Sequence, residues 1–126
     1  MIAFRTRVHG WIDYGIGALS IASPWVFGFA ETGEARGVVI AAGVILIAYS
    51  LLTNYELGVA RAVQIPAHLW LDGLLGLLLA ISPWLLDFDQ RVWIPHVALG
   101  AFLILVAVFS RTIPDYERRG DAGRAP

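Results

Sequence analysis

Four long apolar stretches separated by short polar segments dominate the chain, at residues 11–29, 37–52, 69–86 and 94–110. Each stretch is about 16 to 19 residues long, which gives an α-helix of roughly 24 to 28 Å. That length is slightly short of a hydrocarbon core of about 30 Å, so little tilt or local thinning of the bilayer is needed. The pattern therefore predicts four membrane-spanning helices.

The second stretch distinguishes a membrane bundle from a soluble one. A soluble bundle needs polar outer faces, and residues 38–52 show none around the circumference of a helix. The composition agrees, with 58 % hydrophobic and 15 % charged residues and no lysine. The chain has no basic patch interleaved with aromatic residues, so we expect no nucleic-acid partner. The lack of cysteine excludes disulfides and thiolate metal sites.

The chain also contains an internal duplication. A shift of 59 residues brings His9 onto His68 and matches eleven further positions. These are Trp11/Trp70, Asp13/Asp72, Gly17/Gly76, Ser23/Ser82, Pro24/Pro83, Trp25/Trp84, Phe29/Phe88, Ala42/Ala101, Ile45/Ile104, Leu46/Leu105 and Ala48/Ala107. Each repeat, residues 9–52 and 68–111, holds two spans, so the first and third helices run the same way.

The predicted fold class is therefore all-α. We expect a four-transmembrane-helix bundle made of two tandem two-helix repeats, related by a pseudo-two-fold axis along the membrane normal. Residues 1–126 form a single membrane domain with a polar C-terminal tail at residues 117–126.

The arginines predict the orientation of this bundle. The connections, residues 30–36, 53–68 and 87–93, are short, so neighbouring helices are antiparallel and both termini lie on one side. Only Arg36 and Arg91 lie on the opposite side. The other seven are Arg5, Arg7, Arg61, Arg111, Arg118, Arg119 and Arg124. The positive-inside rule therefore places both termini in the cytoplasm.

The doubled Ser-Pro-Trp, at residues 23–25 and 82–84, resembles the SPW-repeat family of small prokaryotic membrane proteins. The resemblance takes in the preceding His-x-Trp-x-Asp of both copies and covers nearly the whole chain. It implies a multi-pass protein of the bacterial inner membrane, surrounded by the lipid bilayer. The family carries over no catalytic residues and no cofactor.

Histidine and aspartate are four residues apart in both copies, so each pair lies on one face of its helix. The pairs are His9 with Asp13 and His68 with Asp72. If they converge at equal depth, these four residues form a candidate binding site that suits a divalent metal or a proton relay. No third ligand is visible beside either pair, so we assign no metal.

We prefer a structural interpretation of these residues. Each aspartate is then satisfied by the histidine of its own repeat, by a helix N-terminus or by a cytoplasmic arginine such as Arg5, Arg61 or Arg111. The histidine caps its helix. Changing either aspartate to asparagine should then weaken thermal stability modestly and leave metal content and ion conductance unchanged.

Proline within an apolar run has two interpretations. It removes a backbone donor, and the preceding serine hydroxyl can bond the freed carbonyl, which gives a stabilised kink. Alternatively, serine caps a short resumed helix whose first residue is proline, as in the broken helices of transporters. We expect the kink, with tryptophan anchors at both membrane interfaces, Trp11 and Trp70 at one and Trp25 and Trp84 at the other.

Small residues predict where helices approach closely. They are Ala18 with Ala22, Gly76 with Ala80, and Gly17, Gly43, Gly73 and Gly100, and we expect packing within the chain rather than between protomers. His96 has no counterpart in the first repeat and lies near Asp87, Asp89 and Arg91. We expect it to be a local hydrogen-bonding partner and assign it no role.

The expected function is a non-catalytic membrane module, structural or ligand-binding, that self-associates or joins a membrane assembly. No nucleophile and base pair, phosphate-binding loop, haem motif or metalloprotease helix is present, so we do not expect an enzyme. One rival is an oligomeric channel or transporter lined by Asp13 and Asp72, and another is a membrane enzyme with a metal, lipid or quinone there. Mid-span polarity is scarce beyond Ser20, Tyr49 and Ser50, which favours the structural class.

Overall fold

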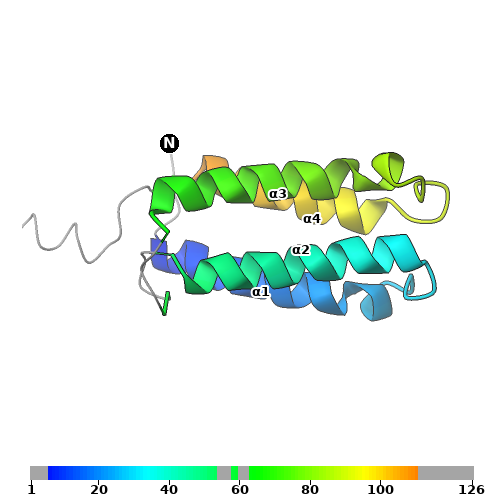
Figure 1. The fold of residues 1–126 in the computed structure, drawn as a ribbon, viewed down its shortest axis with the longest axis horizontal. Helices are drawn as coiled ribbons and strands as arrows, with labels where there is room; N and C mark the ends of the chain where they lie inside the picture. Colours follow the sequence, from blue (N-terminus) through cyan, green and yellow to red (C-terminus); the bar gives the residue numbers. More distant parts are fainter. Residues whose placement is uncertain (1–5, 54–57, 60–62, 111–126) are drawn as a thin grey trace, which may run out of the picture.

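A computed structural model describes residues 6–53, 58–59 and 63–110, and within them it contains four α-helices. They are α1 (Thr6–Val26), α2 (Gly33–Leu51), α3 (Ile65–Leu85) and α4 (Ile94–Val108). Figure 1 shows the helices side by side in a bundle, with α1 and α3 beginning at the same end. The first and third helices therefore run in the same direction, and the prediction of an all-helical bundle is confirmed over the described residues.

Two helices begin earlier than hydropathy predicts. α1 starts at Thr6 rather than residue 11 and α3 at Ile65 rather than residue 69, so each has 21 residues and a length of about 32 Å. Hydropathy places a boundary at the first polar residue, but a helix continues wherever its polar side chains find partners. His9 and His68 therefore lie inside helices.

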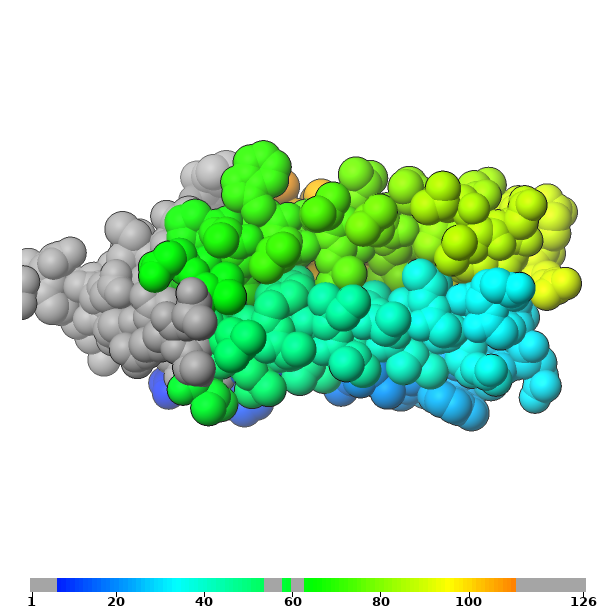
Figure 2. Space-filling model, viewed as in Figure 1, coloured from blue at the N-terminus to red at the C-terminus, as the bar shows by residue number. Residues whose placement is uncertain are grey.

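The outer surface of the bundle is apolar. α2 and α3 are long and apolar enough to cross a membrane, and α4 is a shorter apolar helix. On α3 alone, eight large hydrophobic side chains are exposed, namely Trp70, Leu71, Leu74, Leu77, Leu78, Ile81, Trp84 and Leu85. Figure 2 shows the side of the molecule formed by α2 and α3. An apolar surface of this extent marks a membrane or protein contact rather than a water-facing surface.

Glycines bring the helices of each repeat into contact. A Cβ on Gly43 of α2 would lie 2.6 Å from the carbonyl oxygen of Gly17 on α1, and one on Gly76 would lie 2.6 Å from that of Gly100. These four glycines pack within the chain, as expected. Gly73 was expected to do the same, but nothing lies within 4 Å of a Cβ placed there, so that expectation is wrong.

The Ser-Pro pairs lie inside continuous helices. Pro24 lacks the amide that would bond the Ser20 carbonyl, and the Ser23 hydroxyl donates to this same oxygen at 2.8 Å. In α3 the Ser82 hydroxyl likewise donates to Leu79 O at 2.7 Å. The serine therefore compensates the carbonyl freed by proline, as predicted. The alternative, a helix that restarts at the serine, is wrong.

The same turn follows both Ser-Pro-Trp segments. The amides of Phe29 and Phe88 donate to the carbonyls of Pro24 and Pro83, each at 2.8 Å. The residue before each phenylalanine has positive φ, 77° at Gly28 and 61° at Asp87. Glycine adopts this conformation freely, whereas aspartate is among the few residues that tolerate it. Both turns bury their phenylalanine side chains.

Candidate functional site

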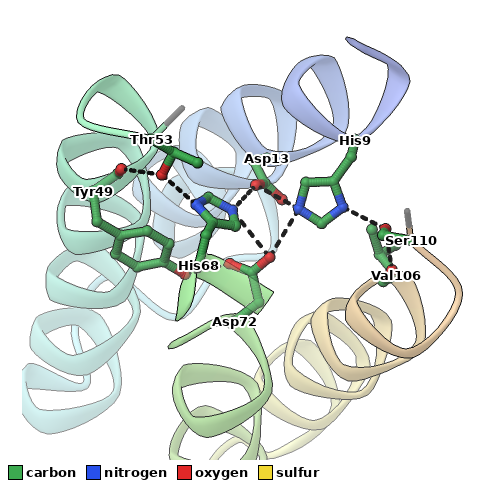
Figure 3. Close-up of polar contacts among 8 residues, drawn as sticks. All are labelled: His9, Asp13, Tyr49, Thr53, His68, Asp72, Val106 and Ser110. Atoms are coloured by element: carbon green, nitrogen blue, oxygen red, sulfur yellow. Dashed lines mark hydrogen bonds and ion pairs between the residues drawn. The ribbon is translucent and has the colours of Figure 1, made fainter. Parts of the chain in front are cut away.

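Four polar side chains meet where α1 and α3 begin. His9 and Asp13 come from α1, and His68 and Asp72 come from α3, and all four are at most 3 % exposed. We call these four residues the His/Asp quartet. Figure 3 shows the two imidazoles and the two carboxylates turned toward one another. The convergence that the sequence allows as one possibility is therefore present in the structure.

The quartet forms a closed ring in which nitrogen and oxygen alternate. His68 Nε2 lies 2.6 Å from Asp13 Oδ2, and His9 Nε2 lies 2.9 Å from Asp72 Oδ2. Within each repeat the same atoms are 2.9 Å apart for His9 and Asp13 and 3.2 Å apart for His68 and Asp72. The histidine of its own repeat was one of three partners expected for each aspartate. The structure has this contact and adds one to the histidine of the other repeat, which is shorter for His68 and equal in length for His9.

Two hydroxyl groups hold the outer nitrogens of the imidazoles. His9 Nδ1 is 2.6 Å from Ser110 Oγ, and His68 Nδ1 is 2.6 Å from Thr53 Oγ1. The Thr53 hydroxyl donates its proton to Tyr49 O at 2.7 Å, and the Ser110 hydroxyl donates to Val106 O. Since each hydroxyl has a single proton, each must accept a hydrogen bond from its histidine.

This pattern assigns the charges. With both carboxylates ionised, each histidine donates from Nδ1 to a hydroxyl and from Nε2 toward the carboxylates, so each carries two ring protons and is an imidazolium. Two imidazoliums and two carboxylates sum to zero. Opposite charges alternate around the ring, and their attraction offsets part of the cost of removing four charges from water.

The surroundings of the two aspartates differ. The Tyr49 hydroxyl donates to Asp72 Oδ1 at 2.5 Å, whereas Asp13 Oδ1 has no hydrogen-bond partner among the described residues. A shift of 59 residues brings Tyr49 onto Val108, which has no group to donate. The second repeat therefore lacks a tyrosine that could donate a hydrogen bond to Asp13 Oδ1, as Tyr49 of the first repeat does to Asp72 Oδ1.

Three further expectations concern this end of the bundle: histidine caps, tryptophan anchors and arginine partners. The expectation that histidine caps its helix is wrong, because His68 is the fourth residue of α3 and bonds Thr53 and Asp13 instead. Trp11 and Trp70 point outward, with 66 % and 82 % of their surface exposed. The arginines proposed as partners, Arg5, Arg61 and Arg111, lie outside the described residues.

His96 lies buried toward the other end of the bundle. Its Nε2 donates to the carbonyl of Ala35 at 2.9 Å, and its ring packs against Phe29 and Phe88. This bond joins α4 to α2 across the two repeats, so His96 is not the local partner that the sequence suggests. Its Nδ1 has no partner among the described residues.

Sequence reasoning missed Tyr49, Thr53 and Ser110 as partners of the quartet. Tyr49 is recognisable as a rare mid-span polar residue, and Thr53 follows it by four positions, just after the end of the predicted span. Neither signal says that these residues contact α3. Ser110 is the last residue of the fourth apolar stretch and carries no such signal.

The long apolar helices and the apolar exterior of the bundle indicate a membrane protein. The family model for the SPW repeat domain matches residues 7–110, so the chain belongs to the SPW-repeat family. Comparisons with curated proteins and with solved structures gave no match.

Proposed function

We propose that the protein is a four-span structural module of the bacterial inner membrane, which associates with copies of itself or with another membrane protein. Its repeats are related by a pseudo-two-fold axis along the membrane normal, and both termini are cytoplasmic. The paired turns after Ser23-Pro24-Trp25 and Ser82-Pro83-Trp84, with matching hydrogen bonds and positive φ, support this symmetry.

The quartet is the observation that carries the proposal. Its charges sum to zero, and its polar atoms except Asp13 Oδ1 bond one another or the hydroxyls of Ser110, Thr53 and Tyr49. A conducting path needs polar groups that contact water or a passing ion. Here the carboxylates are fully buried and turned toward imidazoles of the opposite repeat. Such a cluster joins two halves of a fold.

The apolar grooves also fit a module that contacts lipid or protein. One groove of about 310 Å³ lies between α3 and α4 and is lined by Leu69, Trp70 and Ile104 among others. Another, of about 320 Å³, lies between α1 and α4 beside Ile16, Phe27 and Phe102. No residue of the quartet lines either groove. The quartet is thus separate from these two grooves.

Ion flux distinguishes the structural module from the channel or transporter alternative. In liposomes that hold a potassium or proton gradient, the purified protein should give a flux no greater than that of protein-free liposomes. Asp72→Asn should leave this background unchanged. Extraction from the membrane into native nanodiscs should recover an assembly larger than one chain.

A clear flux above background that Asp13→Asn and Asp72→Asn both abolish contradicts this proposal and favours a pathway lined by the two aspartates. A nanodisc preparation that holds single chains without companions contradicts the association. The Glu31→Gln variant, which alters an exposed carboxylate between α1 and α2, is the matched control for a change of charge.

A further inference from the structure

We propose that the His/Asp quartet is a binding site for one divalent transition-metal ion of the zinc type. This goes beyond a structural role, because it assigns a ligand to residues that otherwise only join the repeats. The four inner atoms, one from each residue, lie within 4.8 Å of one another, and all four residues are buried. They are the Nε2 atoms of His9 and His68 and the Oδ2 atoms of Asp13 and Asp72.

The donor set matches the chemistry of such an ion. Two imidazole nitrogens and two carboxylate oxygens can complete a tetrahedral zinc site with bonds of about 2.0 to 2.2 Å. Donors around such an ion are roughly 3.4 Å apart, as follows from those bond lengths. The nitrogen to oxygen distances in the quartet run from 2.6 to 3.2 Å. A modest outward movement of each side chain therefore makes room for the ion.

The outer contacts of the quartet are those that support metal ligands. A metal-bound histidine usually donates its other ring N–H to an oxygen atom, which fixes the ring. Ser110 and Thr53 supply these oxygens, so both Nε2 atoms face inward. The Tyr49 hydroxyl orients Asp72 in the same way. The sequence alone shows no third ligand beside either pair, and the bundle supplies it from the other repeat.

Asp13 provides an independent observation. Its Oδ1 is fully buried and has no hydrogen-bond partner among the described residues, although an unpaired carboxylate oxygen is costly in an apolar environment. A cation bound by Asp13 Oδ2 lies close to Oδ1 as well and offers it a positive charge. The unpaired oxygen thus fits a carboxylate that binds a metal.

Charge balance restricts the kind of ion. Metal ligation requires that each imidazolium lose its Nε2 proton, so one ion of charge +2 replaces two protons and the cluster stays neutral. A monovalent or trivalent ion would leave a net charge in a buried site. Magnesium and calcium prefer ligand sets made only of oxygen atoms, so the two imidazoles select a transition metal.

Calorimetric titration of the full chain tests the site. Chelator-treated protein in lipid nanodiscs is titrated with zinc chloride in two buffers of different ionisation enthalpy. We expect one zinc ion per chain, release of about two protons on binding, and an affinity that rises with pH. His68→Gln and Asp72→Asn should each weaken binding at least about tenfold. His96→Gln alters a buried histidine that does not belong to the quartet, so this variant should bind zinc as the wild type does.

A wild-type measurement keeps the test decisive if a quartet variant fails to fold. X-ray absorption of the zinc-loaded protein should show two imidazole nitrogens and carboxylate oxygens at about 2.0 to 2.2 Å. The proposal is overturned if zinc does not bind in a fixed ratio, or if the bound ion has only oxygen ligands. Binding of equal strength in folded His68→Gln and Asp72→Asn variants also overturns it.

Discussion

Replacing Asp72 with asparagine should lower the free energy of unfolding by about 3 to 5 kcal/mol, the range observed when one partner of a buried charge pair is removed. The carboxylate of Asp72 is fully buried and contacts His9, His68 and Tyr49. The substitution leaves two imidazoliums with a single counter-charge. This loss exceeds the modest one that the sequence suggests. Reversible unfolding in mixed detergent micelles at neutral pH measures it.

Asp13→Asn should be less destabilising than Asp72→Asn, because Asp13 Oδ1 has no partner to lose. Glu31→Gln, an exposed carboxylate, serves as control and should change stability by less than about 0.5 kcal/mol. If Asp72→Asn unfolds with the same free energy as the wild type, the quartet is not an ionised cluster. A larger loss for Asp13→Asn than for Asp72→Asn contradicts the role assigned to Tyr49.

Gly100→Ala should destabilise the protein by about 1 to 3 kcal/mol or more, as overpacking of a close contact does. A Cβ at this position would overlap the carbonyl oxygen of Gly76 and lie 2.7 Å from the amide nitrogen of Ala80. Backbone atoms cannot rotate aside, so α3 and α4 must separate. The same unfolding experiment measures the change.

Gly73→Ala is the matched control on α3. Nothing lies within 4 Å of a Cβ there, so alanine should stabilise the helix by about 0.5 to 1 kcal/mol through reduced backbone entropy in the unfolded chain. The two glycine substitutions should thus have opposite signs. Equal effects at both positions would show that α3 and α4 do not meet at Gly76 and Gly100.

Much of the site was predictable because of the duplication. The 59-residue shift and the four-residue spacing of histidine and aspartate depend only on sequence and helix geometry. Together with parallel first and third helices they place His9, Asp13, His68 and Asp72 at the same depth, where the four side chains can converge. The hydrogen bond of each Ser-Pro serine was also predictable, because proline and the preceding serine act within one helix turn.

The pairing across repeats was not predictable, because it depends on how far apart α1 and α3 lie and how each is rotated. Tyr49 contacts the quartet from α2, and Thr53 contacts it from just after the end of α2. His96 on α4 contacts Ala35 on α2. No local pattern encodes these tertiary contacts. The alignment of the repeats places Val108 opposite Tyr49. Only the contact between Tyr49 and Asp72 in the structure shows that this difference leaves Asp13 without a matching hydrogen-bond donor.

The number and direction of the membrane crossings form the central claim, and topology mapping tests it most directly. Reporter fusions are placed within residues 30–36, after Gly58, within residues 87–93 and after Pro126. Four spans with cytoplasmic termini predict that the first and third fusions report the periplasm and the second and fourth the cytoplasm. The account is contradicted if the fusion after Pro126 reports the periplasm. It is also contradicted if the fusions within residues 30–36 and after Gly58 report the same side.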